Sequence, residues 1–432
     1  MKTFRFRQRL DKRSVADPYT ETRREMQQLR FSVRKGQTVA VTASSRGISD
    51  IVPITCGVVD HFKESGLKPF IVPAMGSHAG GTAESQRQLL LDYGLTESVL
   101  GCPIRSSMET VLLGELQIDP INQVNQIKPV TQIDQIENNR IDFSDTIYRD
   151  RIPVYFDRLA SEADHVFLVN RIKSHTRFTG SIESGLLKML MIGLGNADGA
   201  GVYHRAVSDD RFSVVIRRVA DFLSQKISLL GGLGIVENGE GKTALLKAIH
   251  APDIANEEEK LLILSKSWMP RLPFDEIDLL FIERIGKNIS GTGFDSNVVG
   301  RKFDDHKALR GEKPVVHCIA VLGLTPETAG NANGIGMAEF CLSSVLREID
   351  WQKTRFNAIT ARHVSAAMIP LDYETEKEII EAAWQTLGRP DLNDFRVVWI
   401  RDTLHLETIT ASESFRNKVI ESGYEIIETN SK

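Results

Sequence analysis

The sequence predicts an α/β protein of two domains, each with a mixed or mostly parallel sheet and flanking helices. Short β-branched or apolar runs alternate with loops and helix-like stretches, a repetition typical of a mostly parallel sheet covered on both faces. A chain of 432 residues is too long for one ordinary core, so two domains are expected. Titratable side chains follow several of the apolar runs, which is where open α/β sheets place their chemistry.

The expected elements follow from local residue patterns. Apolar and β-branched runs predict strands at 38–42, 68–74, 165–169, 227–236, 277–283, 315–323 and 395–401. Helix-like stretches predict helices at 49–64, with Asp50 in its first turn, and at 82–93, 154–163, 253–267, 333–346 and 412–422.

The predicted domain organisation has one crossover and one unusual segment. Residues 1–267 form an N-terminal α/β domain, and the proline-punctuated stretch that starts at Trp268 leads into a C-terminal α/β domain of residues 268–394. A terminal strand and helix, residues 395–432, could return to the first domain. Residues 117–151 are rich in Asn, Gln, Ile and Asp without a helical period, which indicates an inserted excursion or an extra surface hairpin.

Composition excludes several classes of protein. The formal net charge is −4, so no global attraction to nucleic acid or to an anionic membrane is expected. Four widely spaced cysteines without a C-x-x-C pair argue against a zinc knuckle and a disulfide framework. The chain starts without an apolar signal segment, and no run approaches membrane-spanning length, so a reducing cytoplasm is the expected compartment.

The loop Ser44-Ser45-Arg46-Gly47 lies between a predicted strand and the start of a predicted helix. Backbone N–H groups and the helix dipole favour an anion there, and Arg46 adds a bidentate partner. A surface turn with a solvated arginine explains the same residues equally well. The loop is not a Walker motif.

Two histidines follow predicted strands. His78 lies in the glycine-rich loop Gly76-Ser-His-Ala-Gly-Gly81, and its ordinary pKa near working pH suits a general base. His175 lies in the basic loop 171–177, which also contains Arg177 and suggests an anionic ligand. A turn histidine and a solvated basic loop are the alternative interpretations.

Lys188, His204 and Lys287 are further candidates. Lys188 lies within an apolar run, where a free ammonium group is costly unless it is paired, neutralised or able to reach water from an amphipathic helix. A covalent bond would also remove its charge. His204 follows a glycine-rich stretch and could be a metal ligand or a helix-cap residue. Lys287 lies in a glycine-containing loop after a strand of the second domain, and it could bind a carboxylate or phosphate.

Four motifs together resemble the nickel-dependent lactate racemase family. They keep the family's order and rough spacing over most of the chain, most strongly before residue 206: Ser45-Arg-Gly-Ile48, Pro73-Ala-Met-Gly-Ser-His78, Asn170-Arg-Ile-Lys-Ser-His175 and Gly185-Leu-Leu-Lys188 through His204. The resemblance implies two α/β domains with the active site in the cleft between them. It also implies a nickel–pincer nucleotide as cofactor, supplied by cofactor-maturation enzymes.

The resemblance also implies roles for individual residues. Lys188 matches the lysine that joins the nucleotide covalently, and His204 matches a nickel ligand. His78 and His175 match the pair of acid–base histidines. The loop Ser44, Ser45, Arg46 and Gly47 would hold the cofactor, and Arg46, Arg177 and Lys287 would face the substrate.

These features predict an isomerase, a racemase or epimerase of a 2-hydroxy acid that works by reversible hydride transfer to the nickel–pincer nucleotide. A non-catalytic protein that binds the nickel nucleotide is one alternative, but it would not need both His78 and His175. A nicotinamide-dependent dehydrogenase is another, but it would want G-x-G-x-x-G after the first strand. Four cationic side chains lie in these loops, Arg46, Arg171, Arg177 and Lys287, and they predict a hydroxy acid larger or more polar than lactate. The sequence gives no oligomeric state.

Overall fold

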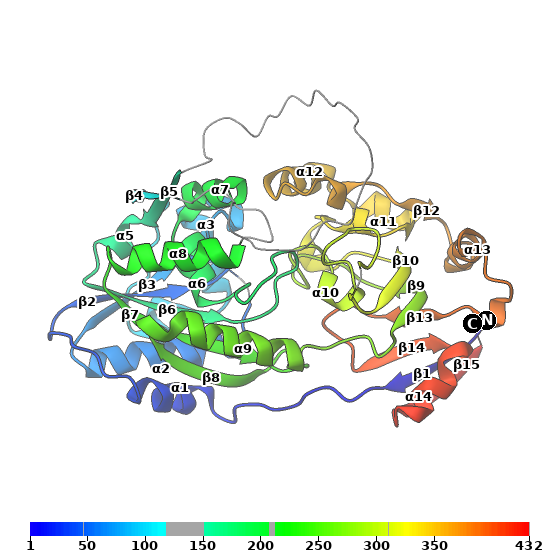
Figure 1. The fold of residues 1–432 in the computed structure, drawn as a ribbon, viewed down its shortest axis with the longest axis horizontal. Coiled ribbons are helices and arrows are strands. Elements are labelled where there is room, and N and C mark those ends of the chain that lie inside the picture. Colours follow the sequence, from blue (N-terminus) through cyan, green and yellow to red (C-terminus); the bar gives the residue numbers. More distant parts are fainter. Residues whose placement is uncertain (46, 118–150, 207–211, 310, 432) are drawn as a thin grey trace, which may run out of the picture.

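The computed structural model describes residues 1–432 except 46, 118–150, 207–211, 310 and 432 (Figure 1). Its described strands form a five-stranded sheet, an eight-stranded sheet and a two-stranded ribbon. The two large sheets lie in separate halves of the molecule, each covered by helices (Figure 1). The predicted α/β class with parallel-dominated sheets is confirmed.

The N-terminal half is built on the five-stranded sheet, in the order β3-β2-β6-β7-β8. Neighbouring strands are parallel except for the last pair. The strands are β2 (Thr38–Ala43), β3 (Lys68–Pro73), β6 (His165–Arg171), β7 (Leu229–Glu237) and β8 (Thr243–His250). The described helices and short helical turns of this half are α1 (Pro18–Gln27), α2 (Ile51–Glu64), η1 (Ala79–Gly81), α3 (Ala83–Asp92), α4 (Glu97–Leu100), α5 (Arg158–Ser161), α6 (Leu186–Lys188), η3 (Met189–Gly193), α7 (Asn196–Ala206), α8 (Phe212–Ser224), η4 (Ala251–Asp253) and α9 (Ile254–Trp268).

Alternate residues of these strands pack in two different hydrophobic cores, one on each face of the sheet. Val39 and Val41 pack with the apolar side of α2, whereas Ala40 packs with residues of α6, α8 and α9 on the other face. Side chains of a strand point to opposite faces in turn, so a strand buried on both faces needs apolar residues at nearly every position. This explains the unbroken apolar runs from which the strands were predicted.

The C-terminal half contains the eight-stranded sheet, in the order β12-β11-β10-β9-β13-β14-β1-β15. Its strands are β1 (Lys2–Arg7), β9 (Glu276–Ile282), β10 (Val315–Val321), β11 (Phe340–Leu342), β12 (Leu371–Tyr373), β13 (Val397–Ile400), β14 (Thr408–Ser412) and β15 (Glu425–Ser431). The α-helices here are α10 (Ser296–Val299), α11 (Ser343–Glu348), α12 (Trp351–Thr360), α13 (Glu376–Leu387) and α14 (Arg416–Glu421). Strands β9 to β13 are parallel, and β14, β1 and β15 are antiparallel to their neighbours.

Both chain ends lie in this second half, close together (Figure 1). Strand β1 pairs with β14 and β15, so residues 2–7 belong to the second sheet although they start the chain. Strand β13 pairs with β9, so residues 395–432 extend the second sheet and do not return to the first. The chain therefore crosses between the halves twice, once after β1 and once after α9.

Two predicted helices are wrong. Residues 151–157 form the strand β5, which pairs with β4 (Thr110–Gln117), and only the four residues of α5 are helical within 154–163. Residues 333–346 are divided among a short 3-10 turn, β11 and α11. Gly334 breaks any helix there, because its φ of 107° is accessible chiefly to glycine.

The remaining predicted strands agree with the structure to within a few residues, and the helix predicted at 412–422 is shortened to a 3-10 turn followed by α14. The sequence did not predict eight of the described strands, which are β1, β4, β5, β8, β11, β12, β14 and β15. The predicted excursion 117–151 falls almost entirely outside the described residues, and only its flanks, in β4 and β5, are seen to pair. Within the described part of the chain, no helix is long and apolar enough to cross a membrane.

Candidate active site

Three adjacent parallel strands bring the candidate loops to one edge of the five-stranded sheet. Strand β2 lies between β3 and β6, and all three run in the same direction. The loop with Ser44 and Ser45 follows β2, the loop with His78 follows β3, and the loop with His175 follows β6. The strand order therefore places these loops at one edge of the sheet, while Arg46 lies outside the described residues.

His78 is exposed, and its ring is held by the neighbouring loop. The Nδ1 atom of His78 lies 2.5 Å from the Oγ atom of Ser45. Tyr93 donates a hydrogen bond of 3.0 Å from its hydroxyl to the Ser45 carbonyl oxygen. A serine hydroxyl can donate or accept, so this contact permits either protonation state of His78.

The backbone next to His78 is fastened to the turn that follows Lys188. The N–H of Gly76 donates to the carbonyl oxygen of Gly193 over 3.1 Å. Gly76 has a φ of 60°, and a Cβ atom there would lie 3.2 Å from the Ile192 carbonyl oxygen. Gln86 completes the attachment by donating to the carbonyl oxygen of Gly76 over 2.9 Å. The His78 loop and the Lys188 segment therefore form one packed structure.

Lys188 ends the short helix α6 and is followed by a π-helical turn, Met189–Gly193. Such turns are rare and occur frequently at functional sites. The apolar neighbours of Lys188 are buried, but Lys188 itself is half-buried. Its Nζ atom lies 5.3 Å from the centre of the Phe178 ring, a distance at which the ring face attracts a cation.

Phe178 also contacts His175. Their rings are stacked with centres 4.3 Å apart and an interplanar angle of 17°, and Phe178 stacks in turn on Phe212 of α8. The Nδ1 atom of His175 lies 3.1 Å from the backbone nitrogen of Arg177 and 3.0 Å from that of Phe178, and both N–H groups donate to it. His175, Phe178 and Lys188 therefore form one cluster, in which Phe178 was not predicted from the sequence.

A buried carboxyl group lies directly beneath α6. Glu258 of α9 accepts a hydrogen bond of 2.9 Å from the N–H of Leu187, and burial raises its pKa to about 7. Its Oε1 atom would lie 2.2 Å from a Cβ atom added at Gly185, so only glycine fits there. The sequence offered no signal for Glu258, because it stands in an acidic helical stretch that reads as a solvated surface.

His204 lies near the end of α7, and its side chain is outside the described part of the structure. The N-terminal half of this helix is close to the His78 loop, since a Cβ atom at Gly76 would lie 3.6 Å from that of Ala200. The helix begins at Asn196, whose side chain donates to the buried carboxylate of Asp157 over 2.9 Å. The helix that carries His204 is therefore anchored beside the cluster.

Two of the predicted cationic groups are engaged by the protein itself. Lys287 donates from Nζ to the carbonyl oxygen of Gly291 over 2.7 Å, within its own loop. Arg171 forms an ion pair of 2.5 Å with Glu237, which also accepts the N–H of Ser49. Glu237 therefore links Arg171 to the segment that follows β2.

A cleft with a volume of about 670 Å³ lies between the two halves. The first half contributes Thr176, Arg177 and Thr179, directly after His175. The second half contributes Thr292, Ser296, Arg301, Lys302, Phe303, Asp304, Asp305, His306, Met337, Arg362, His363, Val364 and Ser365. Arg177 thus lines the cleft, and the hydroxyl and charged groups make the cleft suitable for a polar ligand.

The two halves are joined beside this cleft by a buried ion network. Glu183, only 1% exposed, accepts from Lys302 of the second half over 2.8 Å and from Lys266 over 2.6 Å. Burial lowers the pKa of Lys302, although Glu183 opposes the shift. Glu183 also accepts the N–H of His175 over 2.8 Å, so the network reaches the candidate site. None of these roles was visible in the sequence, because the partners are far apart in the chain.

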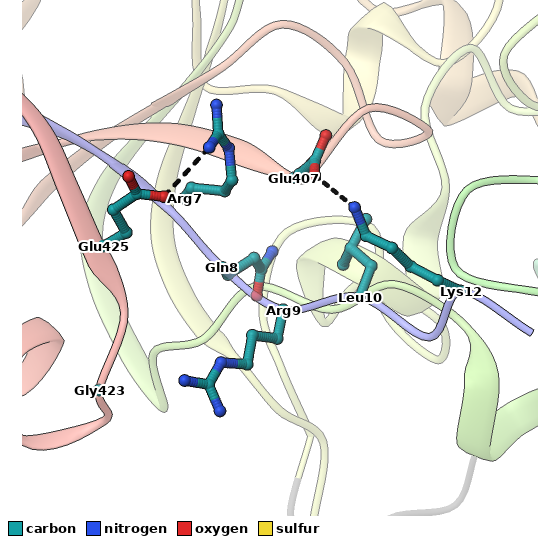
Figure 2. Close-up of a pocket in the computed structure, with 8 residues that line it drawn as sticks. All are labelled: Arg7, Gln8, Arg9, Leu10, Lys12, Glu407, Gly423 and Glu425. Carbon is teal, nitrogen blue, oxygen red and sulfur yellow. Dashed lines mark hydrogen bonds and ion pairs between the residues drawn. The ribbon is translucent and has the colours of Figure 1, made fainter.

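A second hollow, with a volume of about 410 Å³, lies where the chain leaves β1 (Figure 2). Arg7 pairs with Glu425 and Lys12 with Glu407, so charges of opposite sign compensate each other at its rim (Figure 2). None of the candidate residues lines it. We therefore do not assign it to the candidate site.

Glu276, Asp278 and His317 lie close enough to share a metal ion. Their carboxylates are already occupied, because Arg396 pairs with both and Arg389 with Asp278. These ion pairs hold the pKa of Glu276 down at about 2. We interpret this group as a structural ion cluster at the start of β9.

Comparison with known proteins identifies the fold. No family model matches the sequence, and no curated protein matches it. The lactate racemase apoprotein from Thermoanaerobacterium thermosaccharolyticum matches with a TM-score of 0.53 and 13% identity, over 94% of this chain and 99% of that one. A protein from Thermotoga maritima matches with a TM-score of 0.51 and 14% identity, over 82% and 83%. The chain has a lactate racemase-like fold.

Proposed function

We propose that the protein is an isomerase that inverts the configuration of a 2-hydroxy acid, using a nickel–pincer nucleotide joined to Lys188. One observation carries the proposal. His175, Phe178 and Lys188 form a cluster at the sheet edge where the loop of His78 also docks. The fold shared with a lactate racemase apoprotein supports the same reaction class.

The residues at this edge fit such a group in two respects. Lys188 is half-buried among apolar residues, where a charged ammonium group loses part of its hydration. Conversion to a neutral covalent form would remove this free-energy cost. The backbone at Gly47 has open space around it, so a phosphate could approach the loop formed by Ser44, Ser45 and Gly47. Lys188 would hold the group covalently, His204 would bind its nickel, and Arg46 would neutralise its phosphate. When bound, the group supplies a site that accepts and returns a hydride.

The chain's own residues would handle the substrate. His78 is exposed, so its ring can take the proton of the 2-hydroxyl group as C2 becomes planar. Arg177 faces the cleft and suits the substrate carboxylate. Lys287 would have to release the Gly291 carbonyl oxygen before it could bind a carboxylate.

The first test is loading of the protein. Protein produced together with cofactor-maturation enzymes should gain mass, the increment should map to the peptide containing Lys188, and nickel should be present at about one ion per chain. Lys188→Ala should abolish the increment, whereas Lys173→Ala, a lysine elsewhere in the same region, should retain it. Full activity with an unmodified Lys188 would contradict the proposal.

The second test concerns the substrate. We expect inversion of a hydroxy acid larger or more polar than lactate, because Arg177 opens onto a large polar cleft. The measurement is chiral analysis of a panel of enantiopure 2-hydroxy acids in deuterated water. Deuterium should stay out of C2, since a returned hydride does not exchange with solvent. Best turnover on lactate would contradict the expected substrate, and deuterium at C2 would contradict hydride transfer.

A further inference from the structure

The two candidate histidines are held in different ways. The Nδ1 atom of His175 accepts two backbone N–H groups, from Arg177 and Phe178. Backbone N–H groups can only donate, so Nδ1 must be the unprotonated nitrogen of a neutral ring and Nε2 must carry the proton. His78 differs, because its Nδ1 atom meets the Ser45 hydroxyl, which can donate or accept.

The loop that imposes this tautomer is clamped from both halves of the molecule. Glu183 accepts the N–H of His175 over 2.8 Å and the hydroxyl of Ser174 over 2.9 Å. From the second half, Asn297 donates to the His175 carbonyl oxygen over 3.2 Å, and Ser296 donates to that of Thr176 over 2.6 Å. The ring is also stacked on Phe178, so a half-turn flip of the ring would break both N–H contacts, and a rotation out of its plane would break the stack as well.

We propose that His175 acts as a neutral hydrogen-bond donor through Nε2–H, and that His78 alone exchanges the hydroxyl proton with the substrate. A ring with Nε2 protonated cannot take a proton there, and protonation at Nδ1 would turn two favourable contacts into repulsive ones. His175 would instead orient and polarise a substrate oxygen. This assignment rests on the proposed function, but the tautomer itself does not.

The proton balance is simple. As C2 is oxidised, the substrate O–H bond breaks and an N–H bond forms on the His78 ring. As C2 is reduced on its other face, that N–H bond breaks and the O–H bond forms again. The hydrogen of the C2–H bond, together with its electron pair, would pass to the bound nickel–pincer nucleotide and return from it. The Nε2–H bond of His175 stays intact throughout.

The tautomer can be read in the full-length apoprotein. Protein with ¹⁵N-labelled histidine, studied at neutral pH by two-bond ¹H–¹⁵N correlation spectra, should show a neutral ring with Nε2–H for the signals that vanish in His175→Gln. Among the described residues, the charged groups that face this loop include Glu183, Arg177, Lys302 behind Glu183, and Lys188 across Phe178. A doubly protonated ring or an Nδ1–H tautomer would overturn the proposal.

Matched substitutions separate the donor role from a structural one. The amide oxygen of His175→Asn can replace Nδ1 as acceptor without offering a distal donor, whereas the amide nitrogen of His175→Gln can replace Nε2 as donor. In the loaded enzyme we expect His175→Gln to keep kcat within about tenfold, and His175→Asn to lose about 10²–10³. His78→Gln should lose about 10²–10⁴.

The outcomes are distinguishable. If His175→Asn is as active as His175→Gln, or if His175→Gln loses as much as His78→Gln, the donor role is overturned. If the wild-type protein inverts no hydroxy acid when loaded, the proposed function fails and the catalytic part of this assignment fails with it. The tautomer, which is read in the apoprotein, is tested separately.

Discussion

Glu258 is a buried carboxyl group that contacts α6, the short helix that ends at Lys188. It accepts the N–H of Leu187, while its Oε1 atom has no hydrogen-bond partner among the described residues. Removing a carboxylate from water favours its neutral form, and burial is the largest cause of its raised pKa. The residue therefore supports α6 most effectively when it is protonated.

This gives a pH-dependent prediction. The pKa of Glu258 is raised from 4.5 to about 7, so its contribution to stability is fully present below pH 4.5 and is lost as the pH rises through about 7. At about 1.4 kcal/mol per pKa unit, the loss is at most about 3.5 kcal/mol. Glu258→Gln should remove this pH-dependent loss, because a glutamine side chain does not ionise. Urea unfolding at pH 5 and pH 8 should show the variant gaining stability relative to wild type at the higher pH.

The control is Glu421→Gln, which changes an exposed carboxyl group near the end of α14. Its stability relative to wild type should hardly differ between the two pH values. Equal pH dependence of the wild-type protein and Glu258→Gln would contradict the prediction, because it would show that the pKa of Glu258 is the same in the folded and unfolded states.

At the scale of elements, the segment after residue 330 shows how one backbone position ends a helix. Its sequence reads as helical, but Gly334 has a φ of 107°, and a Cβ atom there would lie 1.7 Å from the carbonyl oxygen of Thr292. The chain is therefore turned against the loop that follows Lys287. The short strand β11 then forms beside β10.

We predict that Gly334→Ala lowers the free energy of unfolding by more than about 3 kcal/mol, because it adds a backbone clash to a strained φ. Gly388→Ala is the matched control, since Gly388 has a φ of 60° after α13 with open space around it. It should lose only about 1–2 kcal/mol. Thermal and urea unfolding would compare the two, and similar losses would contradict a role for the Thr292 contact.

At the scale of the whole molecule, the two halves meet through buried charge. Glu183 and Lys302 have side chains that are 1% and 9% exposed, and they come from different halves. A buried pair adds little over apolar residues of the same size, but loss of one partner leaves the other charge buried without compensation. The pair therefore adds little net stability, but it favours the one arrangement of the two halves in which both charges are paired.

Glu183→Gln should lower the free energy of unfolding by about 3–5 kcal/mol, because Lys302 then stays buried without its counter-charge. Adding Lys302→Met should restore a large part of this loss. Glu381→Gln, in the exposed pair of Lys377 and Glu381, should leave stability unchanged within error. A double variant no more stable than Glu183→Gln would show that the buried pair itself, and not the orphaned charge, is what matters.

Much of the architecture could be predicted from local pattern. Strands β2, β3 and β6 were predicted because strands buried on both faces are nearly all apolar, and the position of the loops with His78 and His175 followed from the parallel arrangement. The two wrong helix predictions, at 154–163 and 333–346, also have local causes. The strand at 151–157 was misread as the start of a helix, and Gly334 was not recognised as a break. The functional roles of His78, His175, Lys188 and His204 stay predictions.

What the sequence alone determined was the α/β class, most strands of the parallel core and the loops that emerge from it, because periodicity and turn chemistry act over a few residues. The tertiary structure alone decided the stacking of His175 on Phe178, the Glu183–Lys302 pair and the entry of β1 into the second sheet. Glu183 and Lys302 are 119 residues apart in the chain. Desolvation, hydrogen-bond direction and pairing depend on which distant groups are brought together, and no local pattern encodes that.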